Sequence, residues 1–347
     1  MKTLYNPNFK YTNKMVKLLT NIAVSREIII NSPLIPKWEI TLRSDAIIRS
    51  AHSSTSIEGN RLSFEQVSAL AEGREIMASR KDKQEVLNYL KVLENIDKFT
   101  ESGIEEEGLL KIHQNLTSGT LEDASDSGVY RNKYVVVANR HTGEIIFSPP
   151  KNNEVPELIK ALIIWINSAA ANECDPVIAA GCAHYEFVRI HPFVDGNGRT
   201  ARVLAAIILF LKGFDTKRFF CLDDYYDSDR PAYYKALQSV NPKNIEITEW
   251  LEYFIEGVSV SINAVKERVI RLSSERLRKT VKGQVALTER QMKIVEKIVN
   301  NHQIKIGDIA LMFNITRQAA LKEISKLIKL KVVKLSGRGK NSCYALI

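Results

Sequence analysis

Cysteine is scarce in this chain of 347 residues, which contains four cysteines and no C-x-x-C pair. Scattered cysteines are not typical of a disulfide framework, so we expect reduced thiols and a cytoplasmic location. The longest apolar run, residues 203–211, is far shorter than a membrane span, and the first residues lack the apolar core of a signal peptide. We therefore expect no membrane partner.

Two common motifs of phosphate and metal chemistry are also absent. No G-x-x-x-x-G-K-[ST] occurs, which excludes a P-loop, and no H-E-x-x-H occurs to suggest a zinc hydrolase. The sequence has no internal repeat and no low-complexity segment. A composition of 45% hydrophobic and 26% charged residues is ordinary for a globular protein, and the length allows two or three domains.

The segment 191–202, HPFVDGNGRTAR, concentrates groups suited to phosphate chemistry. Gly196 and Gly198 leave backbone N–H groups open to an anion. A helix is predicted to begin just after them and to direct its positive dipole end to the same place. Arg199 and Arg202 are three residues apart, so both can bind phosphate from one face of its first turn.

The same segment supplies a base and a metal ligand. His191 titrates near neutral pH and can accept a hydroxyl proton. Asp195 offers a carboxylate of the kind that Mg²⁺ takes together with phosphate and water. The alternative interpretation is a tight turn with a core histidine and surface arginines, but such a turn does not require His, Asp, Asn and two Arg together.

This segment resembles the Fic family motif, H-x-F-x-[D/E]-G-N-G-R-x-x-R, at every fixed position. The resemblance implies a mainly α-helical Fic core that transfers AMP from ATP, with Mg²⁺, to a Ser, Thr or Tyr hydroxyl of a target protein. It assigns proton removal to His191, Mg²⁺ binding to Asp195 and anchoring of the loop to Phe193. The anion hole and the outer-phosphate contacts then belong to Gly196, Asn197, Gly198, Arg199 and Arg202.

Residues 54–59, STSIEG, are similar to the family's inhibitory pattern, [ST]-x-x-x-E-[G/N]. Ser54 and Glu58 are four residues apart and are predicted to face one side of a helix. A carboxylate at Glu58 can pair with Arg202 and place negative charge where the γ-phosphate would lie. With Gly59, the resemblance implies an inhibitory helix of the second of three classes. A solvent-facing helix residue is the alternative for Glu58.

Residues 134–147 read as a β-hairpin with Gly143 in its turn. The resemblance identifies this hairpin as the flap, whose edge can pair with an extended segment of the target protein. A surface hairpin without a partner is the alternative. A helix over 176–190 is predicted to carry His191 at its end, with His184 as a packing residue.

The resemblance also implies contacts to adenine and ribose. The candidates are Tyr226, Ser228, Tyr233 and Asn241. Aromatic rings suit base stacking, whereas core packing is the alternative for the tyrosines.

Basic charge gathers at the C-terminal end, where residues 265–347 contain 19 Lys or Arg and 6 Asp or Glu. Three helices, beginning at Thr288, Ile306 and Thr316, and a following hairpin resemble a winged helix-turn-helix domain. The third helix is expected to bury Ala319, Ala320, Ile324, Leu327 and Ile328. Candidate DNA contacts are Arg317, Lys322, Lys326, Arg338 and Lys340. A solvated basic face or a protein-docking module is the alternative.

The predicted organisation is an N-terminal helical domain at 1–95, a Fic core at 96–264, a basic helical linker at 265–283 and a winged helix-turn-helix domain at 284–347. The leading prediction is a protein adenylyltransferase inhibited by Glu58. One alternative is a nucleotide-sensing DNA-binding regulator. Another is transfer of a different phosphate-linked group. A relative that transfers phosphate departs from the motif at its second glycine, whereas this chain keeps Gly198, which favours nucleotidyl transfer. A homodimer is a further hypothesis.

Overall fold

The computed structural model describes residues 5–99, 103–138, 145–215, 217–279, 287–301, 303–330, 332–336 and 342–346. The chain begins with helices α1 (Asn13–Asn31), α2 (Pro36–Ile57), α3 (Phe64–Ala71), α4 (Arg80–Glu94), η1 (Ile96–Phe99), α5 (Glu106–Thr117) and η2 (Ala124–Asp126). A hairpin of β1 (Val137–Ala138) and β2 (Ile145–Phe147) precedes η3 (Asn152–Glu154), α6 (Val155–Ile166), α7 (Ala169–Glu173), α8 (Pro176–Ile190) and α9 (Asn197–Leu211). The remaining elements are α10 (Asp223–Ser228), α11 (Arg230–Gln238), α12 (Thr248–Lys279), α13 (Glu289–Asn301), α14 (Ile306–Met312), α15 (Arg317–Lys329), β3 (Val333–Ser336) and β4 (Cys343–Leu346).

The chain divides into two compact units. The first contains residues 1–28 and 46–266, and the second contains residues 29–45 and 267–347. The proposed linker at 265–283 does not begin as a separate element, because α12 continues through it to Lys279. Residues 29–45 group with the C-terminal unit, whereas the sequence had placed them in the N-terminal domain.

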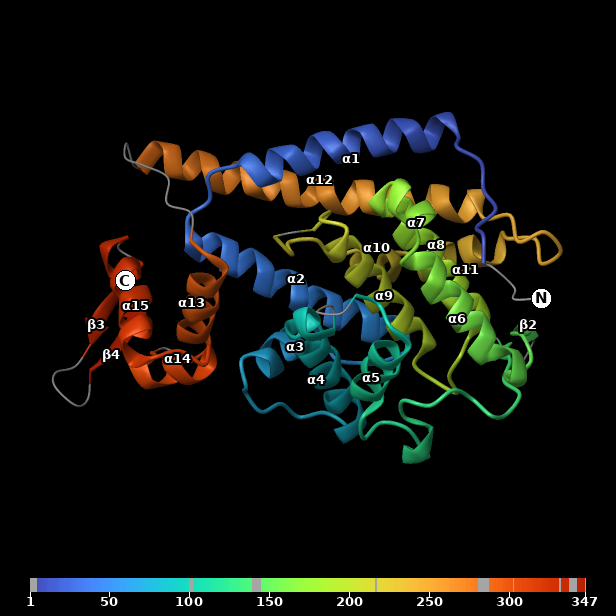
Figure 1. Ribbon diagram of the computed structural model, residues 1–347, viewed down its shortest axis with the longest axis horizontal. Helices are drawn as coiled ribbons and strands as arrows, with labels where there is room; N and C mark the ends of the chain where they lie inside the picture. Colours follow the sequence, from blue (N-terminus) through green and yellow to red (C-terminus); the bar gives the residue numbers. More distant parts are fainter. Residues whose placement is uncertain are drawn as a thin grey trace. The chain divides into compact units, whose positions relative to one another are not determined.

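Helices α8 and α9 pack against each other at the centre of the first unit, with α6 against α8 and α5 against α9 (Figure 1). Helix α8 is rich in small apolar residues and is buried on almost every face. Helix α1 runs beside α12, where the Thr12 hydroxyl donates to Glu252 and Ser25 donates to Asn263. The loop that joins α8 to α9 is therefore held between two buried helices.

Several helix starts are fixed by side-chain caps. Ser63 accepts from the Gln66 N–H and completes a capping box at α3. Asp175 caps α8, which begins at Pro176 as predicted. Helix α9 is an exception, because it begins at Asn197 rather than after the glycines. Gly196 takes the left-handed φ of 80° and forms its N-cap, which brings Gly198 into the first turn.

The predicted hairpin is present but short. Val137 pairs with Phe147 and Ala138 with Ile145 in an antiparallel arrangement. The predicted first strand at residues 134–137 is thus observed only at its end, and the turn with Gly143 lies outside the described residues. Tyr134 and Ile145 are 65% and 58% exposed, so the hairpin displays apolar side chains to solvent.

The second unit has the predicted order of three helices followed by an antiparallel hairpin. Its core joins α13, α14, α15 and the hairpin with Ile40 from α2. Ala320, Ile324 and Leu327 are buried as expected, but Ala319 is only half-buried and Ile328 is 39% exposed. The assignment as a winged helix stays a prediction.

The basic candidates of α15 lie at the surface. Arg317, Lys322 and Lys326 are exposed, and the Lys326 ammonium lies 3.8 Å from the Glu323 carboxylate. Arg338 and Lys340 lie outside the described residues. Among the described helices, none has the length and apolarity needed to cross a bilayer. All four cysteines are free thiols, of which Cys174 alone is half-exposed.

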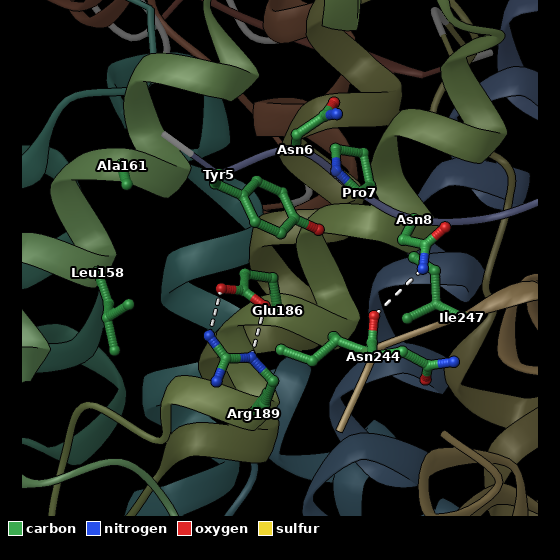
Figure 2. A pocket seen from close by; sticks show the side chains of 11 residues that line it. Tyr5, Asn6, Pro7, Asn8, Leu158, Ala161, Glu186, Arg189, Asn244 and Ile247 are labelled. Atoms are coloured by element: carbon green, nitrogen blue, oxygen red, sulfur yellow. Dashed lines mark hydrogen bonds and ion pairs between the residues drawn. The ribbon is translucent and has the colours of Figure 1, made fainter. Parts of the chain in front are cut away.

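A cavity of about 290 Å³ lies in the first unit between residues 5–8, α6, α8 and residues 244–247. Figure 2 shows the Glu186–Arg189 ion pair at this cavity and the Asn8 amide bonded to the Asn244 carbonyl. Both oxygens of Glu186 accept from Arg189 at 2.7 Å. Both carboxylate oxygens of Glu186 are therefore committed to the ion pair with Arg189.

Candidate active site at the start of helix α9

His191 ends helix α8 in a left-handed conformation, with φ of 51° and ψ of 59°. Non-glycine residues rarely adopt this conformation, and strain of this kind costs about 1–3 kcal/mol. The conformation turns the chain sharply toward α9 while the His191 N–H still donates to the Phe187 carbonyl at 3.0 Å. Surrounding contacts must therefore hold His191 in place.

The His191 ring is poised as a base. Its Nδ1 lies 3.2 Å from the Val188 carbonyl oxygen. A carbonyl can only accept a hydrogen bond, so Nδ1 carries the proton and Nε2 keeps its lone pair. Burial lowers the pKa of His191, an effect that the Val188 carbonyl and the Glu58 carboxylate oppose. The ring is therefore neutral at pH 7 and can accept a proton at Nε2.

Phe193 and Asn197 fix the shape of the loop. Phe193 is fully buried, as the sequence predicted. The Asn197 side chain accepts from the Phe193 N–H and donates to the Phe193 carbonyl, each at 2.9 Å. The Asn197 amide is committed to this structural role, so Asn197 can serve an anion only through its backbone N–H.

The first turn of α9 leaves donors open to an anion. The first intrahelical bond runs from the Thr200 N–H to the Gly196 carbonyl, so the N–H groups of the preceding helical residues have no acceptor within the helix. The Gly196 N–H is already taken by the Asp195 carboxylate at 2.5 Å. The anion hole is thus expected at Asn197, Gly198 and Arg199 rather than at Gly196.

Glu58 covers this helix start. A Cβ built on Gly198 would collide with Oε1 of Glu58, so the Glu58 carboxylate lies directly on the first turn. The same Oε1 accepts from Nη2 of Arg202 at 2.8 Å, as the sequence predicted. Glu58 does not lie within a helix, however, because α2 ends at Ile57 and the chain turns at Gly59, where φ is 96°. This turn directs the carboxylate onto the first turn of α9.

Arg202 is deeply buried and donates to several acceptors through Nε and Nη2. Besides Glu58, it donates to the hydroxyl and the carbonyl of Ser54 at 2.6 and 2.9 Å, and its Nε lies 3.3 Å from Oδ1 of Asp223. Burial raises the pKa of Asp223 to about 6, although Arg202 lowers it. Two carboxylates therefore share one guanidinium, and one of them, Asp223, remains if Glu58 withdraws.

Arg199 is buried but loosely held. Its Nη1 lies 3.6 Å from Oε1 of Glu85 and its Nη2 lies 3.5 Å from Oδ1 of Asp195. Among the described residues, its buried Nε and Nη1 have no hydrogen-bond acceptor. A guanidinium with unused buried donors is suited to receive an anionic ligand.

Asp195 fits the demands of Mg²⁺. Its side chain is 52% exposed, so its carboxylate can reach a ligand bound above the loop. Within the described parts of the chain, no cluster of three or more His, Cys, Asp or Glu could form a cation site. Mg²⁺ commonly takes one or two carboxylates and completes its shell with phosphates and water, which agrees with a single Asp here.

The comparisons with known proteins agree with this geometry. Residues 103–209 match the family model described as Fic/DOC family. A Fic family protein from Desulfovibrio desulfuricans G20 superposes with a TM-score of 0.66 over 99% of this chain and 98% of that chain, at 22% identity. The fold is Fic-like. A Fic domain containing signaling protein from Bacteroides thetaiotaomicron VPI-5482 gives a TM-score of 0.61 over 79% of this chain and all of that one, also at 22% identity.

Two relatives with similar sequences are named protein adenylyltransferases. Protein adenylyltransferase fic-1 of Caenorhabditis elegans is 29% identical over 171 residues, which is 47% of this chain and 32% of that protein. Protein adenylyltransferase Fic of Drosophila mojavensis is 29% identical over 176 residues, 50% of this chain and 33% of that protein. The chain therefore matches about a third of the length of these relatives.

Within the Fic-like core, the tyrosine candidates are core residues. Tyr226 and Tyr233 are 1% and 2% exposed and stack on each other at 4.5 Å between ring centroids. The Tyr233 hydroxyl lies 3.0 Å from Nε2 of His184, which confirms His184 as a packing residue. Because the rings are covered, their predicted stacking on a base is corrected to the packing alternative.

The other two adenosine candidates lie at the surface. The Ser228 hydroxyl donates to the Tyr225 carbonyl at 2.8 Å, and the Asn241 side chain accepts from the Lys243 N–H at 2.9 Å. Both contacts are local turn and helix-end bonds. A role for Ser228 and Asn241 at a nucleotide stays a prediction.

Sequence reasoning missed His113 on α5, a supporting residue of the Fic-like loop. Its ring stacks on Phe193 with 3.6 Å between centroids. Nδ1 accepts from the Gly128 N–H at 2.9 Å, so Nε2 carries the proton and donates to the Asp195 carbonyl at 2.9 Å. Burial lowers the pKa of His113 to about 4, so the ring is neutral at pH 7 and keeps these two hydrogen bonds. No local pattern around His113 signals this contact, since its partners are 15 or more residues away.

Proposed function

We propose that this chain transfers AMP from ATP to a hydroxyl group of a protein, and that Glu58 restrains the reaction. The observation that carries the proposal is the convergence of three features at one loop. These are a neutral imidazole with a free Nε2, a helix start with open N–H donors, and a carboxylate seated on that start. The names of the curated relatives support the same reaction class.

The proposed reaction exchanges the phosphoanhydride bond between the α- and β-phosphates of ATP for a phosphodiester bond to the target. Nε2 of His191 accepts the proton of the target hydroxyl, whose oxygen attacks the α-phosphorus of ATP. The bond between the α-phosphorus and the bridging oxygen breaks, and pyrophosphate leaves with that oxygen. The open N–H groups at the start of α9 and the guanidinium of Arg199 stabilise the charge that develops on phosphate oxygens.

Mg²⁺, when held by Asp195, would neutralise charge on the triphosphate. The target segment is proposed to dock along the hairpin of residues 134–147, whose exposed Tyr134 and Ile145 supply an apolar surface. Backbone pairing on its edge would bring a hydroxyl close to His191.

Glu58 restrains this reaction by occupying the phosphate position. Its carboxylate lies on the first turn of α9 and engages Arg202, so the outer phosphates lose both their space and their cation. Like charge between Glu58 and a phosphate adds to the obstruction. ATP bound beside Glu58 would then lie in an unreactive pose.

The test is the substitution Glu58→Gly, incubated with ATP, Mg²⁺ and a cell lysate. A charge-assisted bond contributes about 1.5–3 kcal/mol, so AMP transfer is expected to rise about 10- to 100-fold. Intact-mass and peptide mass spectrometry should find the mass of AMP on a Ser, Thr or Tyr. Glu72→Gly, which changes an exposed carboxylate after α3, is the matched control and should leave the rate unchanged. Equal rates for wild type and Glu58→Gly would refute the restraint, and no AMP adduct in either would refute the transfer.

A further inference from the structure

Arg131 is a buried arginine bound entirely by carbonyl groups. It is 2% exposed and lies between α5 and the hairpin. Its Nε donates to the His191 carbonyl at 2.7 Å, and Nη2 donates to the Ile190 carbonyl at 3.4 Å. Its own backbone N–H donates to the Pro192 carbonyl at 2.9 Å. Three consecutive carbonyls around the proposed base are thus held by one residue.

These carbonyls belong to the end of α8, where acceptors have no partner in the helix. The last carbonyls of a helix need donors from elsewhere, and a cation there is favoured by the helix dipole. His191 also carries the cost of a left-handed backbone, which persists only if its neighbours enforce it. Arg131 supplies both the donors and the charge at this point.

The same guanidinium reaches the two ends of the hairpin. Nη2 donates to the Pro150 carbonyl at 2.6 Å, three residues after β2 ends at Phe147. Nη1 donates to the Lys133 carbonyl at 3.5 Å, four residues before β1 begins. One side chain therefore connects both stems of the hairpin to the backbone of the base.

We propose that Arg131 is a positioning residue that fixes the backbone from which the His191 imidazole projects and couples it to the hairpin. This inference rests on the proposed function. Arg131 touches no reacting atom, so its loss should slow the reaction without weakening ATP binding. A misplacement of about 1 Å in a catalytic group can cost about 100-fold in rate.

The test compares Arg131→Met and Arg131→Lys, each in the full chain with Glu58→Gly. We expect Arg131→Met to lower kcat about 100-fold with the KM for ATP changed by about twofold or less. Arg131→Lys should recover part of kcat, because an ammonium keeps the charge but cannot span all four side-chain acceptors. The matched control is Arg26→Met, since Arg26 donates to the carbonyls of Gly213 and Phe214 beyond the far end of α9. Arg26→Met should leave kcat unchanged.

A second readout does not depend on activity. The ¹³Cα chemical shift of His191 reports its backbone conformation, and Arg131→Met should move this shift away from the left-handed value, while Arg26→Met should not. A kcat equal to that of Arg26→Met, or a rise in KM with kcat retained, would overturn the inference. If Glu58→Gly itself transfers no AMP, the proposed function fails, and the chemical shift alone then decides the role of Arg131. If Arg131→Met does not fold, Arg131→Lys decides, and its unchanged kcat would overturn the inference.

Discussion

The loop before α9 buries its cationic side chains, whereas α15 exposes its own to solvent. At the loop, Arg199 and Arg202 are at most 4% exposed and face carboxylates from distant parts of the chain. On α15, Arg317 and Lys322 are exposed, and only apolar side chains enter the core. Burying a charge costs stability unless partners compensate for it. The buried arginines of the loop therefore depend on nearby carboxylates, whereas the exposed cations of α15 are solvated by water. The cationic side chains of the loop are therefore enclosed by the protein, whereas those of α15 are solvated.

The largest effect is expected from a substitution in the core of the C-terminal unit. Ile324 is fully buried there, so Ile324→Ala should destabilise this unit by about 2–5 kcal/mol. AMP transfer by the Glu58→Gly chain should persist, because the proposed reacting groups lie in the other unit. Urea denaturation and a transfer assay on the same sample check both parts. If AMP transfer were lost at the same low urea concentration at which the C-terminal unit unfolds, the two units would not be independent.

The second prediction concerns titratable groups of the first unit whose pKa values burial shifts. Burial lowers the pKa of His184 on α8 to about 3, below its unfolded value of about 6.5. The unfolded chain therefore binds a proton first, and His184 should cost about 3 kcal/mol of stability as the pH falls from 6.5 to 4. Asp215 and Asp223, whose pKa values burial raises to about 6, act in the opposite direction.

His184→Gln isolates this effect, because the two aspartates remain in both chains. The stability difference between wild type and His184→Gln should shrink, or change sign, between pH 7 and pH 4. Chemical denaturation at the two pH values measures it. If the stability difference between the two chains were the same at pH 7 and pH 4, His184 would not titrate as its burial requires.

The smallest expected effect lies on α15. Replacing Lys322 and Lys326 with Gln should change the free energy of unfolding by about 0.5 kcal/mol or less, because both side chains are exposed. If α15 binds DNA, as hypothesised from the basic residues of its sequence, the salt dependence of binding should weaken by about two phosphate contacts. A shift assay over a salt series checks this, and absence of binding by wild type at low salt would remove DNA as a partner.

The sequence predicted local features well and distant partners poorly. The bounds of α8 and the helix start at Thr316, which is the N-cap of α15, follow from local preferences and were predicted correctly. The start of α9 was missed by two residues, because the left-handed Gly196 extends the helix toward the loop. Ile328 was expected inside because apolar spacing marks a face but does not determine how wide its covered part is.

The motif 191–202 supplied the candidate reacting groups but not the residues that hold them in place. His113, Arg131 and Asp223 reach the loop from other elements, and nothing in their neighbouring residues signals it. Such contacts depend on tertiary packing, which local spacing does not encode. The pairing of Glu58 with Arg202 was predicted because the family pattern supplied the second partner.

The most direct test of the central claim compares two isotope positions in ATP. The Glu58→Gly chain and the Glu58→Gly chain with His191→Ala are incubated with α-labelled or γ-labelled ATP, and protein-bound label is measured. Protein-bound label is expected from the α-position only, and removing His191 should lower it about 1000-fold with stability unchanged. Label from the γ-position, or α-label retained without His191, would contradict a loop that activates a hydroxyl for transfer of AMP.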